Sequence, residues 1–172
     1  MHDRRSFAGR LLAVATTLLL SPAALWASPG RALFVIARSK NANLLKFEVR
    51  ERADGRLDPA RPLDVYWLML AENGRREELT WTERKFAYGF VVTRVSEQGC
   101  RLTLTACARR SIQVERTSAG YRAQLSIHGK PATLRRIFVR SHDGGLLPRV
   151  EYVELSGVDE SGALVSERIA AT

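Results

Sequence analysis

The chain has 172 residues, of which 45% are hydrophobic and 26% are charged. This length predicts a single domain with a substantial hydrophobic core. Lys and Arg number 27 against 18 Asp and Glu, which gives a net charge of +9. A basic balance can indicate a nucleic-acid partner, but only four of these cations are Lys, and the Arg residues lie in scattered pairs without a basic block. A genome whose base composition favours Arg codons would produce the same count of Arg. Charge alone therefore does not establish a polyanionic partner.

The first 27 residues predict a signal peptide for export. Arg4 and Arg5 precede the apolar run Leu11–Leu20, and the small residue Ala27 offers a cleavage site before Ser28. The apolar run is about ten residues long, which is too short for a membrane-spanning helix of about 20 residues. The two adjacent arginines fit the twin-arginine pathway, and the Sec pathway is the alternative.

Export defines the compartment and narrows the partners. Cleavage near Ala27 would leave 28–172 as one β-rich domain, periplasmic or secreted, with no transmembrane span. It lowers Lys and Arg from 27 to 24 and Asp and Glu from 18 to 17, so the mature net charge is +7. The polyanions outside the inner membrane are lipid headgroups, lipopolysaccharide and anionic wall polymers. We therefore expect no nucleic-acid partner.

The mature sequence alternates apolar and polar residues in short runs separated by turn residues, which is typical of β-strands. In chain order, this pattern predicts about nine strands, at 33–38, 45–50, 63–70, 90–95, 101–107, 112–117, 121–128, 133–141 and 149–155. Their close spacing favours hairpins. We therefore predict an all-β, mostly antiparallel fold, with a small barrel- or sandwich-like sheet and one short helix. Residues 156–172 are expected to form a short last strand and a loose C-terminal tail over about 160–172.

The one helix is predicted over residues 81–88. Thr80 and Glu83 have the spacing of a capping box, in which each side chain bonds the backbone N–H of the other. Gly89 suits a left-handed stop after the last turn. Positions i, i+4 and i+7 of this helix would put three side chains on one face: Trp81, Lys85 and Tyr88.

The two cysteines, Cys100 and Cys107, are expected to remain free thiols even in an oxidising compartment. The residues between them alternate as a strand and include no turn residue. Seven strand steps would separate their Cα atoms by about 23 Å, whereas a disulfide needs about 5.5–6 Å. The two thiols would pair only if that strand bent sharply.

Established catalytic and metal-binding motifs are absent from the sequence. It has no His-Glu-x-x-His, Gly-x-Ser-x-Gly, phosphate-loop or Cys-x-x-Cys motif. His128 is expected on the polar face of its strand. A metal site made of His128, His142 and Asp143 would need three ligands on one face, which this spacing does not predict. We therefore predict no metal and no cofactor.

Two parts of the chain carry side chains suited to ligand contact. In the first, an apolar strand leads into two cations and two amides: Arg38, Lys40, Asn41 and Asn43. The alternative interpretation is a tight hairpin turn. In the second, a strand and the predicted helix could form a ligand wall: Tyr66, Trp67, Glu83, Lys85 and Tyr88. The alternative there is core packing with a lysine that reaches solvent.

These same segments carry a resemblance to a family. The matching motifs, in order, are Leu33-Phe-Val-Ile-x-Arg-Ser-Lys-Asn-x-Asn43, Val65-Tyr-Trp67, Glu78-Leu-Thr80, Lys85-x-Ala-Tyr-Gly89 and Gly145-x-x-Pro148-x-Val150-x-Tyr152. Together they span roughly 33–157 and resemble the family known as domain of unknown function 4833. The resemblance implies an exported single domain and no particular activity.

Three functions are compatible with these features. The first is non-catalytic binding of an anionic or amphiphilic envelope ligand, such as a lipid or glycan, inside a small barrel. The cations would meet its charge and the aromatic residues its apolar or sugar face. The second is a periplasmic enzyme with Glu83 as acid/base and Lys85 as its charge partner. The third is a structural or assembly module of the cell envelope. The binding hypothesis requires three segments to be neighbours around one concavity: the Arg38–Asn43 strand end, the Tyr66-Trp67 strand and the 81–88 helix. Five side chains would converge there: Arg38, Lys40, Tyr66, Lys85 and Tyr88.

Overall fold

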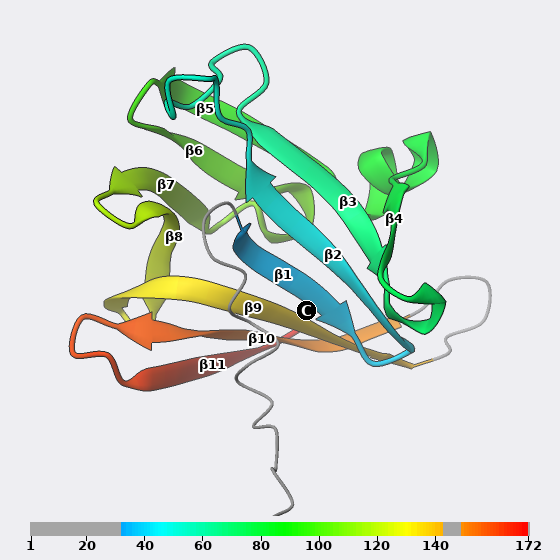
Figure 1. The fold of residues 1–172 in the computed structure, drawn as a ribbon. Helices are drawn as coiled ribbons and strands as arrows, with labels where there is room; N and C mark the ends of the chain where they lie inside the picture. The colour runs from blue at the N-terminus through cyan, green and yellow to red at the C-terminus, as the bar shows by residue number, and fades with distance from the viewer. Residues whose placement is uncertain (1–31, 143–148, 172) are drawn as a thin grey trace, which may run out of the picture.

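The computed structural model describes residues 32–142 and 149–171. The expected signal peptide and Asp143 lie outside the described residues. Eleven strands form one sheet (Figure 1). They are β1 (Ala32–Arg38), β2 (Asn41–Val49), β3 (Leu63–Met69), β4 (Arg75–Glu78), β5 (Phe90–Ser96), β6 (Gly99–Leu104), β7 (Ser111–Thr117), β8 (Gly120–Ile127), β9 (Lys130–His142), β10 (Arg149–Asp159) and β11 (Leu164–Ala170). The helical turns are η2 (Leu70–Glu72), η3 (Glu83–Ala87) and η4 (Thr105–Cys107).

The long strand β9 joins the two arms of the sheet. The strand order is β4-β3-β2-β1-β9-β8-β7-β6-β5, and β9 also pairs with β10, which pairs with β11. β8 pairs with the start of β9 and β1 pairs with its later part, so the sheet turns along this strand and curls into a half-barrel (Figure 1). The predicted all-β, mostly antiparallel fold is confirmed. The β1–β9 pair is parallel, which a meander of hairpins alone would not produce.

The core fills the space between the two arms. Alternating side chains of most strands point into it, as the strand period of two requires. The ring of Phe47 stacks on Phe34 at 4.5 Å and meets the edge of Phe90 at 5.7 Å. Because Phe34 and Phe47 belong to one arm and Phe90 to the other, these contacts hold the two arms together. Burial of each such ring contributes about 1.5–3 kcal/mol.

The predicted helix is a single α-turn that widens into a π-turn. The capping box is present: Glu83 N donates to Thr80 Oγ1 at 3.3 Å, and Thr80 N donates to Glu83 Oε2 at 2.8 Å. Arg84 N bonds Thr80 O four residues back, whereas Tyr88 N bonds Glu83 O five residues back. The prediction of a left-handed stop at Gly89 is wrong, because the φ of Gly89 is not positive. A Cβ there would lie 2.6 Å from Arg84 O, so glycine is needed for close approach.

One strand was not expected from the sequence pattern, and another replaces a segment that was expected to be mostly loose. β4 consists of four charged residues without apolar alternation, and it forms by pairing with β3. The expected last strand is present as β11, but the loose tail predicted from about residue 160 is wrong, because β11 pairs with β10 along its whole length. Val165, Glu167 and Ile169 alternate as its less exposed face. That alternation was the available signal, and the polar residues around it obscured it.

Both cysteines are free thiols. The strand between them ends at Leu104, three residues before the predicted end at residue 107, and η4 follows. Cys100 is buried in the core, and burial raises the pKa of its thiol to about 11. A thiol of that pKa is protonated and unreactive while the protein is folded.

Candidate functional site

Three separate segments of the chain meet at one end of the core. Arg38 is the last residue of β1, and Trp67 lies in β3. Glu83 is the first residue of η3, and Tyr88 directly follows this turn. The Trp67 and Tyr88 rings meet edge to face at 5.1 Å, and the Arg38 guanidinium lies 4.4 Å from the Trp67 ring centroid. We call these four residues the inner cluster. The three segments therefore lie side by side, as the binding hypothesis requires, but the concavity described below lies elsewhere.

The inner cluster holds the Arg38 guanidinium in a fixed position. Arg38 continues the inward-pointing row of β1 that includes Phe34 and Ile36. Its Nη1 donates to Tyr88 Oη at 2.7 Å, while its plane lies over Trp67. Its Nε is buried and has no hydrogen-bond acceptor. Among the described residues, no carboxylate oxygen forms a salt bridge with Arg38, so its charge lacks a direct counter-ion.

Glu83 is an ionised carboxylate, and both of its oxygens already accept hydrogen bonds from the protein. Oε1 accepts from Trp67 Nε1 at 3.0 Å, and Oε2 accepts from the backbone N and the Oγ1 of Thr80, both at 2.8 Å. Burial by itself would raise the pKa of Glu83, but these hydrogen bonds and the Arg38 charge outweigh it and lower the pKa below its usual value. Thr80 is the one member of this network that the candidate set omitted, although the capping box had indicated it.

Tyr88 supplies a neutral hydroxyl to the inner cluster. Burial raises the pKa of Tyr88 more than the neighbouring Arg38 charge lowers it. The phenol therefore stays protonated at neutral pH and accepts the Arg38 hydrogen bond as a neutral oxygen. This arrangement fixes the guanidinium without neutralising its charge.

The remaining candidates of the first segment belong to the hairpin between β1 and β2. Arg38 pairs with Asn41 across that hairpin, and Asn43 N donates to Asn41 Oδ1 at 3.2 Å. Lys40 lies exposed at the turn. The hairpin interpretation therefore accounts for the pattern at Lys40, Asn41 and Asn43.

Tyr66 and Lys85 face away from the inner cluster. Tyr66 lies on the opposite face of β3 from Trp67, where Arg76 covers its ring at 3.9 Å. Lys85 is exposed, and its Nζ lies 4.8 Å from the Trp81 ring centroid. The prediction that Trp81, Lys85 and Tyr88 share one face is wrong, because the π-turn adds a residue before Tyr88 and turns that ring inward.

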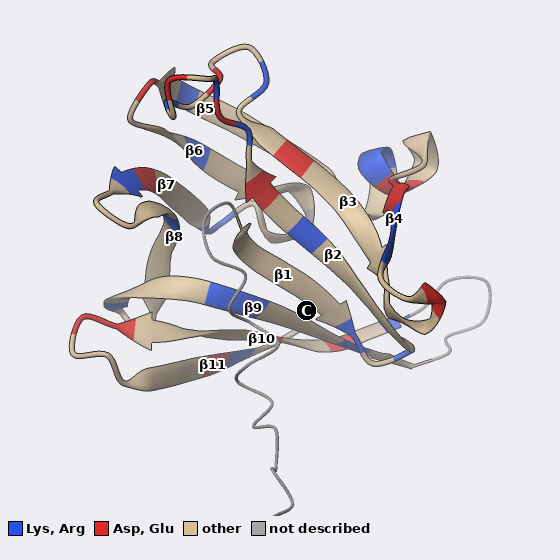
Figure 2. Cartoon of the chain, viewed as in Figure 1, with Lys and Arg blue, Asp and Glu red and all other residues tan. Residues whose placement is uncertain are grey.

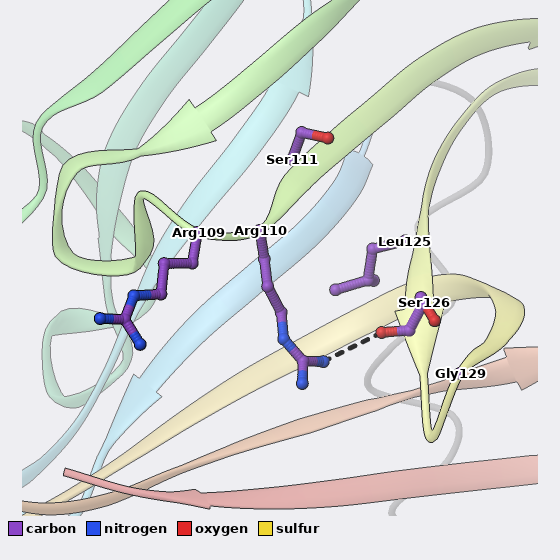
Figure 3. A pocket seen from close by; sticks show the side chains of 6 residues that line it. All are labelled: Arg109, Arg110, Ser111, Leu125, Ser126 and Gly129. Carbon is purple, nitrogen blue, oxygen red and sulfur yellow. Dashed lines mark hydrogen bonds between the residues drawn. The ribbon is translucent and has the colours of Figure 1, made fainter. Parts of the chain in front are cut away.

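A separate concavity opens where β7, β8 and the β8–β9 turn meet (Figure 3). It encloses about 420 Å³ and is lined by Arg109, Arg110, Ser111, Leu125, Ser126 and Gly129. None of the nine candidate residues lines it. The Arg110 charge is already used, because its guanidinium binds Glu167 at 2.9 and 2.5 Å and donates to Ser126 O at 3.0 Å. Through these contacts Arg110 links Glu167 of β11 to Ser126 at the end of β8.

The Arg110–Glu167 pair predicts a dependence of stability on acid pH. The Arg110 hydrogen bonds, followed by the backbone N–H of His128, lower the pKa of Glu167 from 4.5 to about 2. Because the folded pKa lies below the ordinary value, the carboxylate stabilises the fold above about pH 4.5. That stabilisation is lost as the pH falls toward 2. We expect Glu167→Gln to lower the free energy of unfolding by about 1–2 kcal/mol at pH 7, since solvent screens part of the pair.

Urea denaturation of the wild type and Glu167→Gln at pH 7 and pH 3 measures this effect. The difference between the two proteins should shrink at pH 3. The matched control is Glu151→Gln, which removes an exposed carboxylate that lies 3.6 Å from Arg140. An equal loss for both variants at both pH values would contradict the prediction.

No metal-binding group of three or more His, Cys, Asp and Glu side chains occurs within 32–142 and 149–171. Within the same ranges, no helix is long and apolar enough to cross a membrane. In the view of Figure 2, Lys and Arg are interspersed with Asp and Glu over several strands rather than gathered in one field.

The fold and the inner cluster define a β half-barrel domain with an arginine held in an aromatic setting at the end of its core. The chain belongs to the family described as Domain of unknown function (DUF4833), whose model matches residues 34–168. The resemblance seen in the sequence motifs is thus confirmed. No curated protein and no solved structure matches the chain.

Proposed function

We propose that this chain is an exported, non-catalytic binding protein whose inner cluster takes the anionic group of an amphiphilic envelope ligand. One observation carries the proposal. The Arg38 guanidinium is held by Trp67 and Tyr88, yet its buried Nε has no acceptor and no carboxylate of the described residues pairs with it. A buried donor without an acceptor is costly, and an incoming anion would remove that cost.

The geometry of Arg38 favours an oxyanion such as phosphate or carboxylate. A guanidinium whose face rests on an indole keeps its N–H groups in the plane of its edge, where they can donate to two oxygens at once. The contacts with Trp67 and Tyr88 restrict the side chain before binding. Little conformational entropy would then be lost when a ligand binds.

The surroundings of Arg38 favour a ligand that also has an apolar part. Tyr88 and Val139 are partly buried hydrophobic residues that pack against the core. Val139 is the β9 register partner of Arg38. A charged head at Arg38 would therefore have aromatic and aliphatic side chains beside it.

The catalytic alternative finds little support in the same residues. A general acid at neutral pH needs a raised pKa, whereas the pKa of Glu83 is lowered and both of its oxygens are engaged. Lys85, its proposed charge partner, lies on the outer side of the turn against Trp81. Glu83 therefore acts as a support for Trp67 and for the cap of the turn.

Titration calorimetry with hexyl phosphate tests the proposal. The wild type should bind this probe and should not measurably bind hexyl glucoside, which has a similar chain without the charge. Arg38→Gln should weaken binding about 10- to 100-fold, since it removes charge-assisted hydrogen bonds of about 1.5–3 kcal/mol.

The matched control is Arg61→Gln, which removes an exposed arginine that pairs with Asp64 at 3.3 Å. It should change the affinity for hexyl phosphate by less than about twofold. Thermal unfolding verifies that both variants are folded. If the folded Arg38→Gln variant binds hexyl phosphate as tightly as the wild type, the inner cluster is not the anion site.

A further inference from the structure

Two aromatic side chains and a lysine project from the outer side of the turn that carries Glu83. Trp81 is 68% exposed and Phe86 is 69% exposed, and their ring centroids lie 6.0 Å apart. Lys85 Nζ lies 4.8 Å from the Trp81 centroid and 5.2 Å from that of Phe86. We call these three residues the aromatic knob. Singly exposed apolar residues are ordinary, but two aromatic rings in contact with a cation form a small amphipathic patch.

The turn beneath the aromatic knob is firmly held. On its inner side, Glu83 accepts from Trp67 and Tyr88 packs in the inner cluster. On its flank, Arg84 Nε donates to Leu79 O at 3.2 Å, and Arg84 pairs with Glu78 at 3.1 Å. The aromatic knob is therefore presented on a fixed turn, where its exposure is a stable feature of the surface.

We propose that the aromatic knob docks this protein on the surface of an anionic lipid bilayer. Indole rings favour the headgroup level of a bilayer, where one part of the ring is apolar and the other is wet. A lysine beside them can extend its ammonium to the phosphates while its stem stays in apolar surroundings. Among the described residues, no acidic side chain forms a salt bridge with Lys85, so its charge is available for anionic lipid.

Two further observations favour a bilayer over a protein partner. The aromatic knob has three side chains, whereas a stable protein interface uses about 20–30 residues on each side. The chain as a whole carries a net charge of +9, and its mature part +7, which an anionic leaflet attracts. A small projecting patch on a basic protein fits the surface of a membrane.

The aromatic knob and the inner cluster lie on opposite sides of one short turn. Docking would therefore bring the end of the half-barrel that holds Arg38 close to the lipid surface. The docking inference does not depend on the proposed ligand site, because the aromatic knob and the inner cluster can be altered separately.

Vesicle flotation with the purified protein tests the docking. The probes are vesicles of equal parts phosphatidylglycerol and phosphatidylcholine, compared with vesicles of phosphatidylcholine alone. The wild type should float with the anionic vesicles and much less with the neutral ones, and its Trp emission should shift to the blue. The double variant Trp81→Ala/Phe86→Ala should lower partitioning onto anionic vesicles by about tenfold or more, because it removes two insertable rings.

Lys85→Gln separates the electrostatic part of the docking. It should lower partitioning onto the anionic vesicles about fivefold and leave the small amount on neutral vesicles unchanged. The matched control is Leu164→Ala, which removes an apolar side chain that is 88% exposed in β11. That variant should float like the wild type, and circular dichroism should give the same fold for all of them.

The Trp81→Ala/Phe86→Ala variant keeps the two proposals distinguishable. It should bind hexyl phosphate as tightly as the wild type even where it no longer floats with the anionic vesicles. Docking is overturned if the wild type does not float with the anionic vesicles, or if the Trp81→Ala/Phe86→Ala variant floats as well as the wild type. A wild type that self-associates in sedimentation experiments but does not bind vesicles would also overturn docking. If the double variant then loses this self-association, the aromatic knob is a protein interface.

Discussion

Trp67→Ala is expected to lower the free energy of unfolding by about 3–5 kcal/mol, as for other buried Trp truncations. The Trp67 side chain is only 4% exposed and lies in the main core cluster. Its removal deletes the contacts with Tyr88 and Arg38 and leaves a cavity at the end of the half-barrel. It also leaves Glu83 Oε1 without its indole donor. The loss of stability is therefore expected to be large, because the ring contacts, the filled volume and the hydrogen bond to Glu83 are all lost together.

Urea denaturation followed by circular dichroism measures this loss without depending on Trp fluorescence. Trp67→Phe keeps a buried ring but removes the N–H, so it should cost less, about 1–2 kcal/mol. Trp81→Ala is the matched control, because it removes the same side chain from an exposed position and should change stability by less than about 0.5 kcal/mol. Equal midpoints for Trp67→Ala and Trp81→Ala would mean that the indole of Trp67 is not part of the core.

Gly99→Ala is the second change with a large expected effect, about 3 kcal/mol of lost stability through overpacking. Gly99 begins β6 and pairs with Glu115 of β7. A Cβ at Gly99 would lie 2.0 Å from the carbonyl oxygen of Val114. That oxygen belongs to the backbone of a paired strand, so it cannot move away as a flexible side chain could. The pairing of β6 with β7 would have to open locally.

Gly162→Ala is the matched glycine control. Gly162 has a φ of +85°, but a Cβ there would meet no atom within 4 Å. Its cost should come from backbone strain alone, about 1 kcal/mol. Thermal unfolding of both variants compares the two mechanisms. A Gly99→Ala variant that is no less stable than Gly162→Ala would mean that the β6–β7 ladder can accommodate the methyl group.

Local patterns predicted much of the fold because they act over a few residues. The alternation of Leu45, Phe47 and Val49 identified β2, and all three side chains are buried. The Thr80–Glu83 spacing identified the start of the helical turn, and both of its hydrogen bonds are present. The sequence pattern does not predict β4 because its four charged residues have no apolar period, and it forms only by pairing with β3 across the preceding turn.

The candidate site was predicted in part. Of the nine candidate residues, four form the inner cluster: Arg38, Trp67, Glu83 and Tyr88. Tyr66 and Trp67 were grouped because they are neighbours in sequence, yet the strand pleat turns adjacent side chains to opposite faces. Lys85 and Tyr88 were grouped by the period of an α-helix, which the π-turn at Glu83 does not follow.

The sequence by itself determined the strand-rich class, the family, the capping box and the residue types available for an anion site. These depend on side-chain periodicity and on short-range spacing, which a linear chain already contains. Export and ligand binding stay predictions from the same sequence. Only the tertiary structure decided that β1 lies parallel to β9 and that Arg38 meets Trp67 and Tyr88. Those contacts join residues far apart in the chain, and they form because the two arms must close on one shared core.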